Sequence, residues 1–174
     1  MKLLFIGDIV GEPGRTAVHA LVPRLRDRLG IQFVVANGEN SAGGSGITPH
    51  IAEELFSSGV HVITTGDHVW DQRETAEFLP TEPRLLRPLN YPAGVPGNGS
   101  VIVRKPGLPP VAVLNLQGRT FLSALENPFL VGPAEVGRLR QETPIVFVDI
   151  HAEATTEKIA LGRLLDGSVS AVVS

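Results

Sequence analysis

Four apolar runs in the sequence each end on side chains that could do chemistry. Continuous apolar runs of this length are typical of strands that are buried on both faces of a parallel sheet. The carboxyl ends of parallel strands share one edge of the sheet, where ligand crevices form. Side chains that follow the four runs are therefore expected to converge. These side chains are Asp8, Glu39, Asn40, Asp67, His68 and His151.

Convergence of the three carboxylates, those of Asp8, Glu39 and Asp67, requires a compensating charge. Two carboxylates about 4 Å apart repel by about 4 kcal/mol at an effective dielectric constant of about 20, so three need a proton or a cation between them. Carboxylate, amide oxygen and neutral imidazole together suit manganese, iron, zinc or magnesium. The sequence therefore predicts a site for divalent metal, and two ions sharing one carboxylate would suit this number of ligands.

Each of these residues also has an ordinary structural interpretation. Asp after Gly often forms a turn or caps a helix, and a single histidine is often a plain hydrogen-bonded side chain. Coincidence at four strand ends is much less expected than at one, which favours the functional interpretation. The other three histidines lie within helical or strand patterns and are interpreted as structural: His19, His50 and His61.

The surrounding pattern predicts one α/β domain with mixed sheets. Helices are expected over 15–29, from the Thr48-Pro49 cap to Gly59, and from a capping box at Asp71 and Glu74 to Leu79. Residues 100–116 predict an antiparallel hairpin, and 88–99 a long surface loop. The expected buried strands are 3–6, 33–36, 60–64, 111–116, 145–150 and 169–173.

Composition excludes several classes of protein. The 174 residues suit one core, and the net charge of −3 lacks the basic excess of a typical nucleic-acid binder, so nucleic acid is considered only as a substrate. The chain has no cysteine, which excludes disulfides and thiolate zinc sites and fits a cytoplasmic location. No apolar stretch approaches the roughly 20 residues needed to span a bilayer, so no membrane association is expected.

Three rival motifs are absent. The glycines after the first strand, in "GDIVGEPG", do not fit the dinucleotide-binding pattern, and Asp8 would put a negative charge beside a pyrophosphate. The "AGGSG" segment lacks the Gly-Lys-Ser/Thr of a phosphate-binding loop. The sequence also has no Gly-x-Ser-x-Gly elbow, so a serine hydrolase is unsupported.

Seven segments in order along the whole chain resemble the bacterial YmdB-like family of calcineurin-type metallophosphoesterases. The segments are "FIGDIVGEPGR", "NGENSAGG", "TTGDHVWD", "RPLNYPAG", "NLQGRTFL", "NPF" and "VFVDIHAEATTEK". The resemblance implies a metallophosphoesterase-type two-sheet β-sandwich flanked by helices. It also implies a dinuclear metal centre, with iron or manganese favoured and magnesium or zinc as alternatives. The implied activity is hydrolysis of cyclic nucleotides or similar phosphodiesters by metal-activated hydroxide.

The resemblance also implies a role for each matching residue. Asp8 is similar to a terminal ligand of the first metal, Glu39 to the bridging carboxylate, and Asn40 to a further ligand of the first metal. His151 is similar to a ligand of the second metal, Asp67 stands at a ligand position, and His68 resembles the proton donor. Arg87 and Arg119 lie in loop-like segments and are candidates to hold the substrate phosphate.

Two features depart from the family pattern. The family usually has Asn where this chain has Asp67, which adds a negative charge. The family also continues into a Gly-Thr-His-Thr-His motif, whereas the sequence stops at Ser174. We therefore expect residues 1–174 to be a fragment of a longer chain, weak in metal binding and prone to self-association. A nucleotide-sensing module without turnover, or a lyase with one metal, stays open as an alternative.

Overall fold

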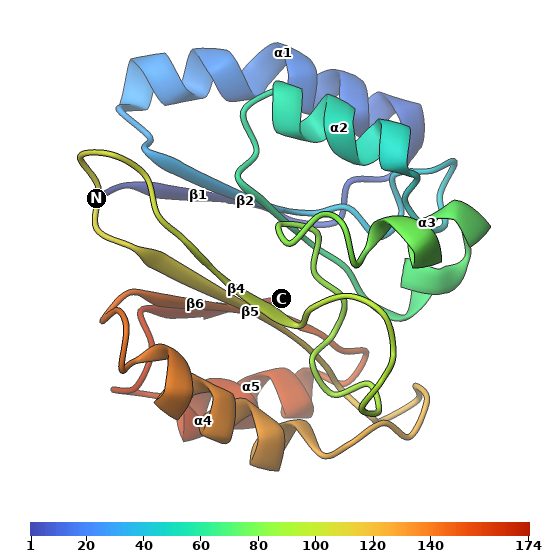
Figure 1. Cartoon of the computed structure of the whole chain (residues 1–174), viewed down its shortest axis with the longest axis vertical. Helices are drawn as coiled ribbons and strands as arrows, with labels where there is room; N and C mark the ends of the chain where they lie inside the picture. Colours follow the sequence, from blue (N-terminus) through green and yellow to red (C-terminus); the bar gives the residue numbers. More distant parts are fainter.

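The computed structural model describes residues 1–174 and consists of two facing β-sheets with helices on the outer faces (Figure 1). The first sheet is parallel throughout, in the order β1-β2-β3. The second has the order β4-β5-β6-β7, and only β4 runs antiparallel to its neighbour. The predicted mixed α/β sandwich is therefore confirmed. The strands are Leu3–Ile6, Phe33–Asn37, Val62–Thr64, Ser100–Val103, Val111–Gln117, Val146–His151 and Ala171–Val173, for β1 to β7.

Helices α1 and α2 cover the first sheet, and α4 and α5 cover the second (Figure 1). A short 3₁₀ helix, η1, follows β3 directly and begins at Asp67, one of the predicted site residues. No helix is long and apolar enough to cross a membrane. The helices are Gly11–Leu29, Pro49–Ser57, Arg73–Phe78, Pro128–Leu139 and Thr155–Leu164 for α1 to α5, and Asp67–Trp70 for η1.

The hydrophobic core forms three layers. One lies between α1, α2 and the first sheet, and one between the second sheet and α4, α5. The third lies between the two sheets and includes Phe33, Val113 and Phe147. Every residue of β2 and β5 is buried, which explains why these strands are mostly apolar rather than alternating. Polar residues within them, such as Asn115, therefore lie in the interior.

Helix caps account for two of the helix starts. The Thr48 hydroxyl accepts a hydrogen bond from the Ile51 N–H at 3.2 Å and begins α2, as predicted. The expected capping box at Asp71 is wrong: α3 begins after Gln72, and the Asp71 carboxylate accepts a hydrogen bond from Ser45 instead. Helix α4 was not predicted, although Asn127 followed by Pro128 gives the same signal as Thr48-Pro49.

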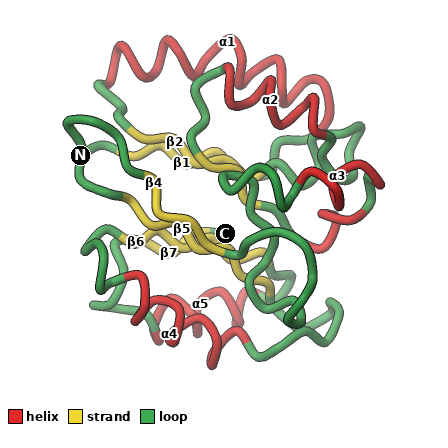
Figure 2. Tube along the Cα trace, in the orientation of Figure 1, coloured by secondary structure: helices red, strands yellow, loops and turns green.

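The antiparallel hairpin of β4 and β5 is confirmed. Residues 88–99 contain no helix or strand, as expected, but Pro88 and Asn90 are buried, so the start of this segment is not on the surface. Figure 2 shows long loops gathering beside α3, on the right of that view, at one end of the sandwich.

Candidate metal centre

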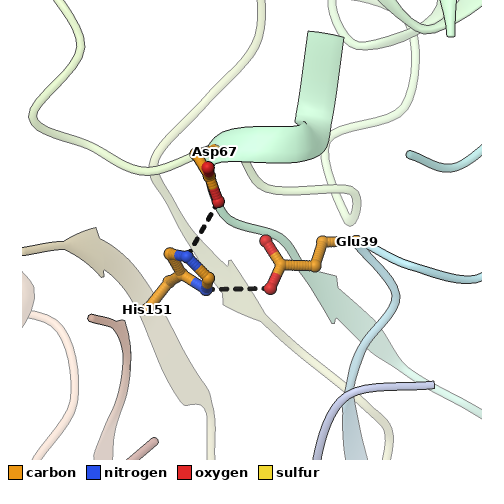
Figure 3. A group of neighbouring side chains, drawn as sticks. All are labelled: Glu39, Asp67 and His151. Carbon is orange, nitrogen blue, oxygen red and sulfur yellow. Dashed lines mark ion pairs between the residues drawn. The ribbon is translucent and has the colours of Figure 1, made fainter. Parts of the chain in front are cut away.

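Glu39, Asp67 and His151 meet where the carboxyl ends of the two sheets face each other (Figure 3). Glu39 follows β2, Asp67 follows β3, and His151 ends β6. The His151 ring lies between the two carboxylates, with Nδ1 2.8 Å from Glu39 Oε1 and Nε2 2.9 Å from Asp67 Oδ1. One ligand atom from each residue lies within 4.8 Å of the others. The first sheet thus supplies two of the three side chains and the second sheet supplies the third.

The electrostatics of this cluster favour a cation between the carboxylates. Glu39 is 3% exposed, and half-buried Asp67 faces the same imidazole. Burial alone would lower the pKa of His151, but the hydrogen bond to Glu39 and the negative charges of Glu39 and Asp67 raise it above its ordinary value. The two carboxylates thus favour the protonated form of the imidazole, and one such ring can balance only one of their two charges.

The donor set fits a divalent metal ion. Two carboxylates and one imidazole are oxygen and nitrogen ligands of the kind that iron, manganese and zinc accept. Glu39 Oε2 and His151 Nε2 are both buried and have no hydrogen-bond partner, since the close approach of Nε2 to Asp67 lacks hydrogen-bond alignment. Buried polar atoms normally have partners. A bound cation would supply one to each of these two atoms.

Gly66 leaves room for the cluster. A Cβ atom at this position would overlap Glu39 Oε2 and press against the His151 ring. The φ of Gly66, −146°, lies outside the left-handed region, and the constraint that the structure shows at this position is steric. Any side chain here would displace the groups that form the cluster.

Asp8, Asn40 and His68 form a second group that continues from the first. Asn40 Nδ2 donates to Asp8 Oδ1 at 2.7 Å, and its Oδ1 lies 2.8 Å from His68 Nδ1. The other ring nitrogen, His68 Nε2, lies 4.0 Å from Asp67 Oδ2. Asp8 has φ +25°, an uncommon conformation for a residue other than glycine. The structure thus brings all six predicted side chains into one connected set.

Buried polar residues behind the cluster connect the two sheets. The Asp149 carboxylate in β6 accepts hydrogen bonds from Thr64 Oγ1 at 2.5 Å and from Asn37 Nδ2 at 3.4 Å, both on the first sheet. Asn37 Oδ1 accepts the Glu39 N–H at 3.1 Å, which fixes the loop that carries Glu39. Burial raises the pKa of Asp149 to about 6. In the sequence, the feature that could have indicated this network is Asp149, a polar residue within the otherwise apolar segment "VFVDIH".

A second polar bridge joins the sheets beside the first. Asn115 in β5 accepts from the Thr65 N–H at 2.9 Å and donates to the Thr65 carbonyl at 3.0 Å. Its side chain pairs with the backbone that leads directly into Gly66 and Asp67. The second sheet thereby holds a segment of the first in place.

The structure does not leave Arg87 free for a substrate phosphate. Arg87 is buried, and its guanidinium donates to the carbonyls of Pro88, Leu89, Val95 and Pro96 at 2.8 to 3.3 Å. The side chain therefore holds the loop of residues 88–96 together. The presence of an arginine at this position does not by itself indicate such a structural role, because the acceptors are backbone carbonyls of a loop.

Arg119 lies on an exposed loop after β5. Its N–H and that of Thr120 donate to the two oxygens of Glu157 at 2.9 and 3.0 Å, which fixes the loop backbone. The Arg119 side chain remains a candidate for contact with substrate.

A cavity of about 230 Å³ borders the cluster and is lined by Asp8, Asn37, Asp149 and His151 among others. A larger cavity of about 580 Å³ lies between α1 and α2 and is lined by none of the six site residues. The smaller cavity is therefore the space relevant to the chemistry of the cluster.

Comparison with known proteins places the chain in a family. The family described as YmdB-like protein matches residues 4–174. The matched residues include both sheets and the group of Glu39, Asp67 and His151 at the strand ends. The chain belongs to the YmdB-like family.

A curated relative is similar in sequence, and two solved structures are similar in fold. The chain is 47% identical over 173 residues to the 2',3'-cyclic-nucleotide 2'-phosphodiesterase of Bacillus subtilis, covering 99% of this chain and 65% of that protein. A hypothetical protein from Thermus thermophilus superposes with a TM-score of 0.90 at 39% identity, covering 99% of this chain and 66% of that one. A Mycoplasma pneumoniae structure described as a novel phosphatase gives 0.88 at 30% identity, covering 97% and 61%. The chain thus spans just under two thirds of the length of these relatives.

Proposed function

We propose that this protein is a phosphodiesterase that uses two divalent metal ions and acts on cyclic nucleotides. The observation that carries the proposal is the connected set of six side chains at the carboxyl ends of the two sheets. The name of the Bacillus subtilis relative supports a 2',3'-cyclic nucleotide as the substrate.

Five residues are assigned to the metals. Asp8 and Asn40 would hold the first ion, His151 and Asp67 the second, and Glu39 would bridge the two. Two such ions, when bound, would neutralise a phosphodiester and supply a nucleophile at neutral pH. Iron or manganese suits this mixture of carboxylate, amide and imidazole, and zinc or magnesium is the alternative.

Metal binding by His151 should depend on pH. The imidazole must be neutral to bind a metal, whereas the hydrogen bond to Glu39 and the charges of Glu39 and Asp67 raise its pKa in the metal-free protein. A metal would therefore compete with a proton for this ring, and metal binding should strengthen as the pH rises.

His68 is assigned as the proton donor to the leaving alkoxide. The Asn40 Nδ2 group is used on Asp8, so Asn40 presents its carbonyl oxygen to His68, and Nδ1 of the ring must donate to it. The mobile proton of a protonated His68 therefore sits on Nε2. Asp67 lies on the same side, with Oδ2 4.0 Å from Nε2.

The test combines metal analysis with turnover of a 2',3'-cyclic nucleotide. We expect about two equivalents of metal and phosphodiester hydrolysis that stops on chelation. Glu39→Gln keeps the shape of the side chain and should lower both metal content and turnover, whereas Glu77→Gln, at an exposed position of α3, should change neither. Metal and nucleotide binding without turnover would contradict the proposal and indicate a nucleotide-sensing module.

A further inference from the structure

Gln117 is a buried side chain whose amide has no partner. It is the last residue of β5 and is fully buried, and neither Oε1 nor Nε2 makes a hydrogen bond. Its backbone is fully paired, because its N–H donates to Asn90 Oδ1 at 2.9 Å and its carbonyl accepts from Asn90 Nδ2 at 2.8 Å. Only the side chain lacks partners, so a ligand is the natural candidate to supply them.

The sheet register places Gln117 beside the metal centre. Gln117 pairs with His151 across the parallel strands β5 and β6. Side chains alternate along a strand, and Val113, four residues earlier, belongs to the layer between the sheets. Gln117 therefore points into that layer next to His151, on the strand beside the one that carries the ring drawn in Figure 3.

A polar bridge between the sheets places Asp67 at the same end. Asn115 in β5 is hydrogen-bonded in both directions to Thr65 of the facing segment. Two residues further along each segment lie Gln117 and Asp67. The register and this bridge thus place Gln117 at the end of the sandwich that carries Asp67 and His151, and Asn90 fixes its backbone there.

We propose that the Gln117 carboxamide binds substrate by donating a hydrogen bond from Nε2 to a phosphoryl oxygen. This inference rests on the proposed phosphodiesterase function. A carboxamide offers two N–H donors, and hydrogen bonds to an ionised acceptor are stronger than those between neutral groups. Unlike lysine or arginine, it adds no positive charge that would compete with the metals for the carboxylates of Glu39 and Asp67.

The first test is Gln117→Met in the metal-loaded protein. Methionine keeps the length of the side chain and removes its hydrogen bonds. The Kd for inorganic phosphate should rise about tenfold, and kcat/KM for a 2',3'-cyclic nucleotide should fall by about the same factor. Metal content should not change, and Tm should not fall, because an unpartnered buried amide is replaced by an apolar group. Gln141→Met, at an exposed position after α4, is the matched control.

A second measurement uses the unmodified chain loaded with diamagnetic zinc or magnesium. The side-chain NH₂ resonances of Gln117 should shift on addition of inorganic phosphate, while those of Gln141 should not. This measurement shows whether the Gln117 side chain contacts phosphate even if Gln117→Met fails to fold.

Several results would overturn the assignment. These are phosphate binding that leaves both the Gln117 resonances and the affinity of the variant unchanged, a protein that binds no phosphate, and a folded variant that loses metal. Failure of the proposed function gives a different pattern. In that case phosphate affinity still depends on Gln117, but the unmodified protein turns over no cyclic nucleotide.

Discussion

Replacing Asp149 by Asn should make the protein more stable at neutral pH when metal is absent. Asp149 is 2% exposed and accepts hydrogen bonds from Thr64 and Asn37 through one oxygen, Oδ2. Asparagine keeps an acceptor oxygen for both donors and has the same shape. The substitution therefore removes the buried negative charge and little else.

The expected change in the free energy of unfolding follows from the pKa of Asp149. Burial raises this pKa from 3.8 to about 6, so the folded state binds the proton more tightly than the unfolded state does. The stability gained from that proton is complete at low pH and is lost as the pH rises from 3.8 through about 6. A difference of about two pH units corresponds to about 3 kcal/mol. Asparagine carries no such dependence.

The assay is urea unfolding of chelator-treated protein, followed by the fluorescence of the single tryptophan, Trp70. The free energy of unfolding of Asp149→Asn, relative to the unmodified chain, should increase by about 2 to 3 kcal/mol between about pH 4 and about pH 7.5. The exposed control Asp166→Asn should change stability by no more than about 0.5 kcal/mol at either pH. A difference between variant and parent that is the same at both pH values would refute the argument that burial disfavours the ionised carboxyl.

Three further substitutions test the metal centre. Gly66→Ala should reduce metal content severalfold in elemental analysis, because its methyl group would overlap Glu39 and press on His151; full metal content would show that the loop can move aside. Asp67→Asn removes one negative charge and should lower KM for an anionic phosphodiester severalfold at saturating metal; an unchanged or higher KM would speak against repulsion by Asp67. His68→Ala should retain metal and lower turnover by about 10² to 10⁴, less so for a nitrophenyl ester, whose leaving group needs little protonation. An equal loss on both substrates would exclude proton donation by His68.

Parallel pairing explains why the residues that follow β1, β2 and β3 converge at one edge. His151 ends a strand of the second sheet, so its place beside them depends on how the two sheets pack, which no short-range pattern specifies. The strands themselves could be predicted because a strand buried on both faces must be apolar throughout, and this is a short-range pattern. The helix starting at Thr48 was predictable for the same reason, since the capping side chain and the N–H it accepts from are three residues apart.

Features that depend on distant partners could not be predicted in this way. Asp71 has the spacing of a capping residue, yet Ser45, far away in sequence, takes its carboxylate. The acceptors of Arg87 are loop carbonyls whose positions no local pattern specifies. Gln117 differs, because its inward position follows from alternation along β5, but its lack of partners became visible only once both sheets were in place.

The polar bridges between the sheets have a consequence for how accurately the centre is assembled. Most of the layer between the sheets is apolar, and apolar contact is non-directional, so by itself it would allow one sheet to slide along the other. Hydrogen bonds from Thr64 to Asp149 and between Asn115 and Thr65 lose their energy over a displacement of less than about 1 Å. These bonds involve Thr64, Thr65 and Asp149, which lie two or three residues from Asp67 or His151 in the sequence. Asp67 and His151 approach the centre from opposite sheets. The displacement of one sheet relative to the other that the protein tolerates is therefore smallest at the end of the sandwich where an ion would have to be coordinated. It increases toward the opposite end, where sequence changes that shift the sheets should be accepted more readily.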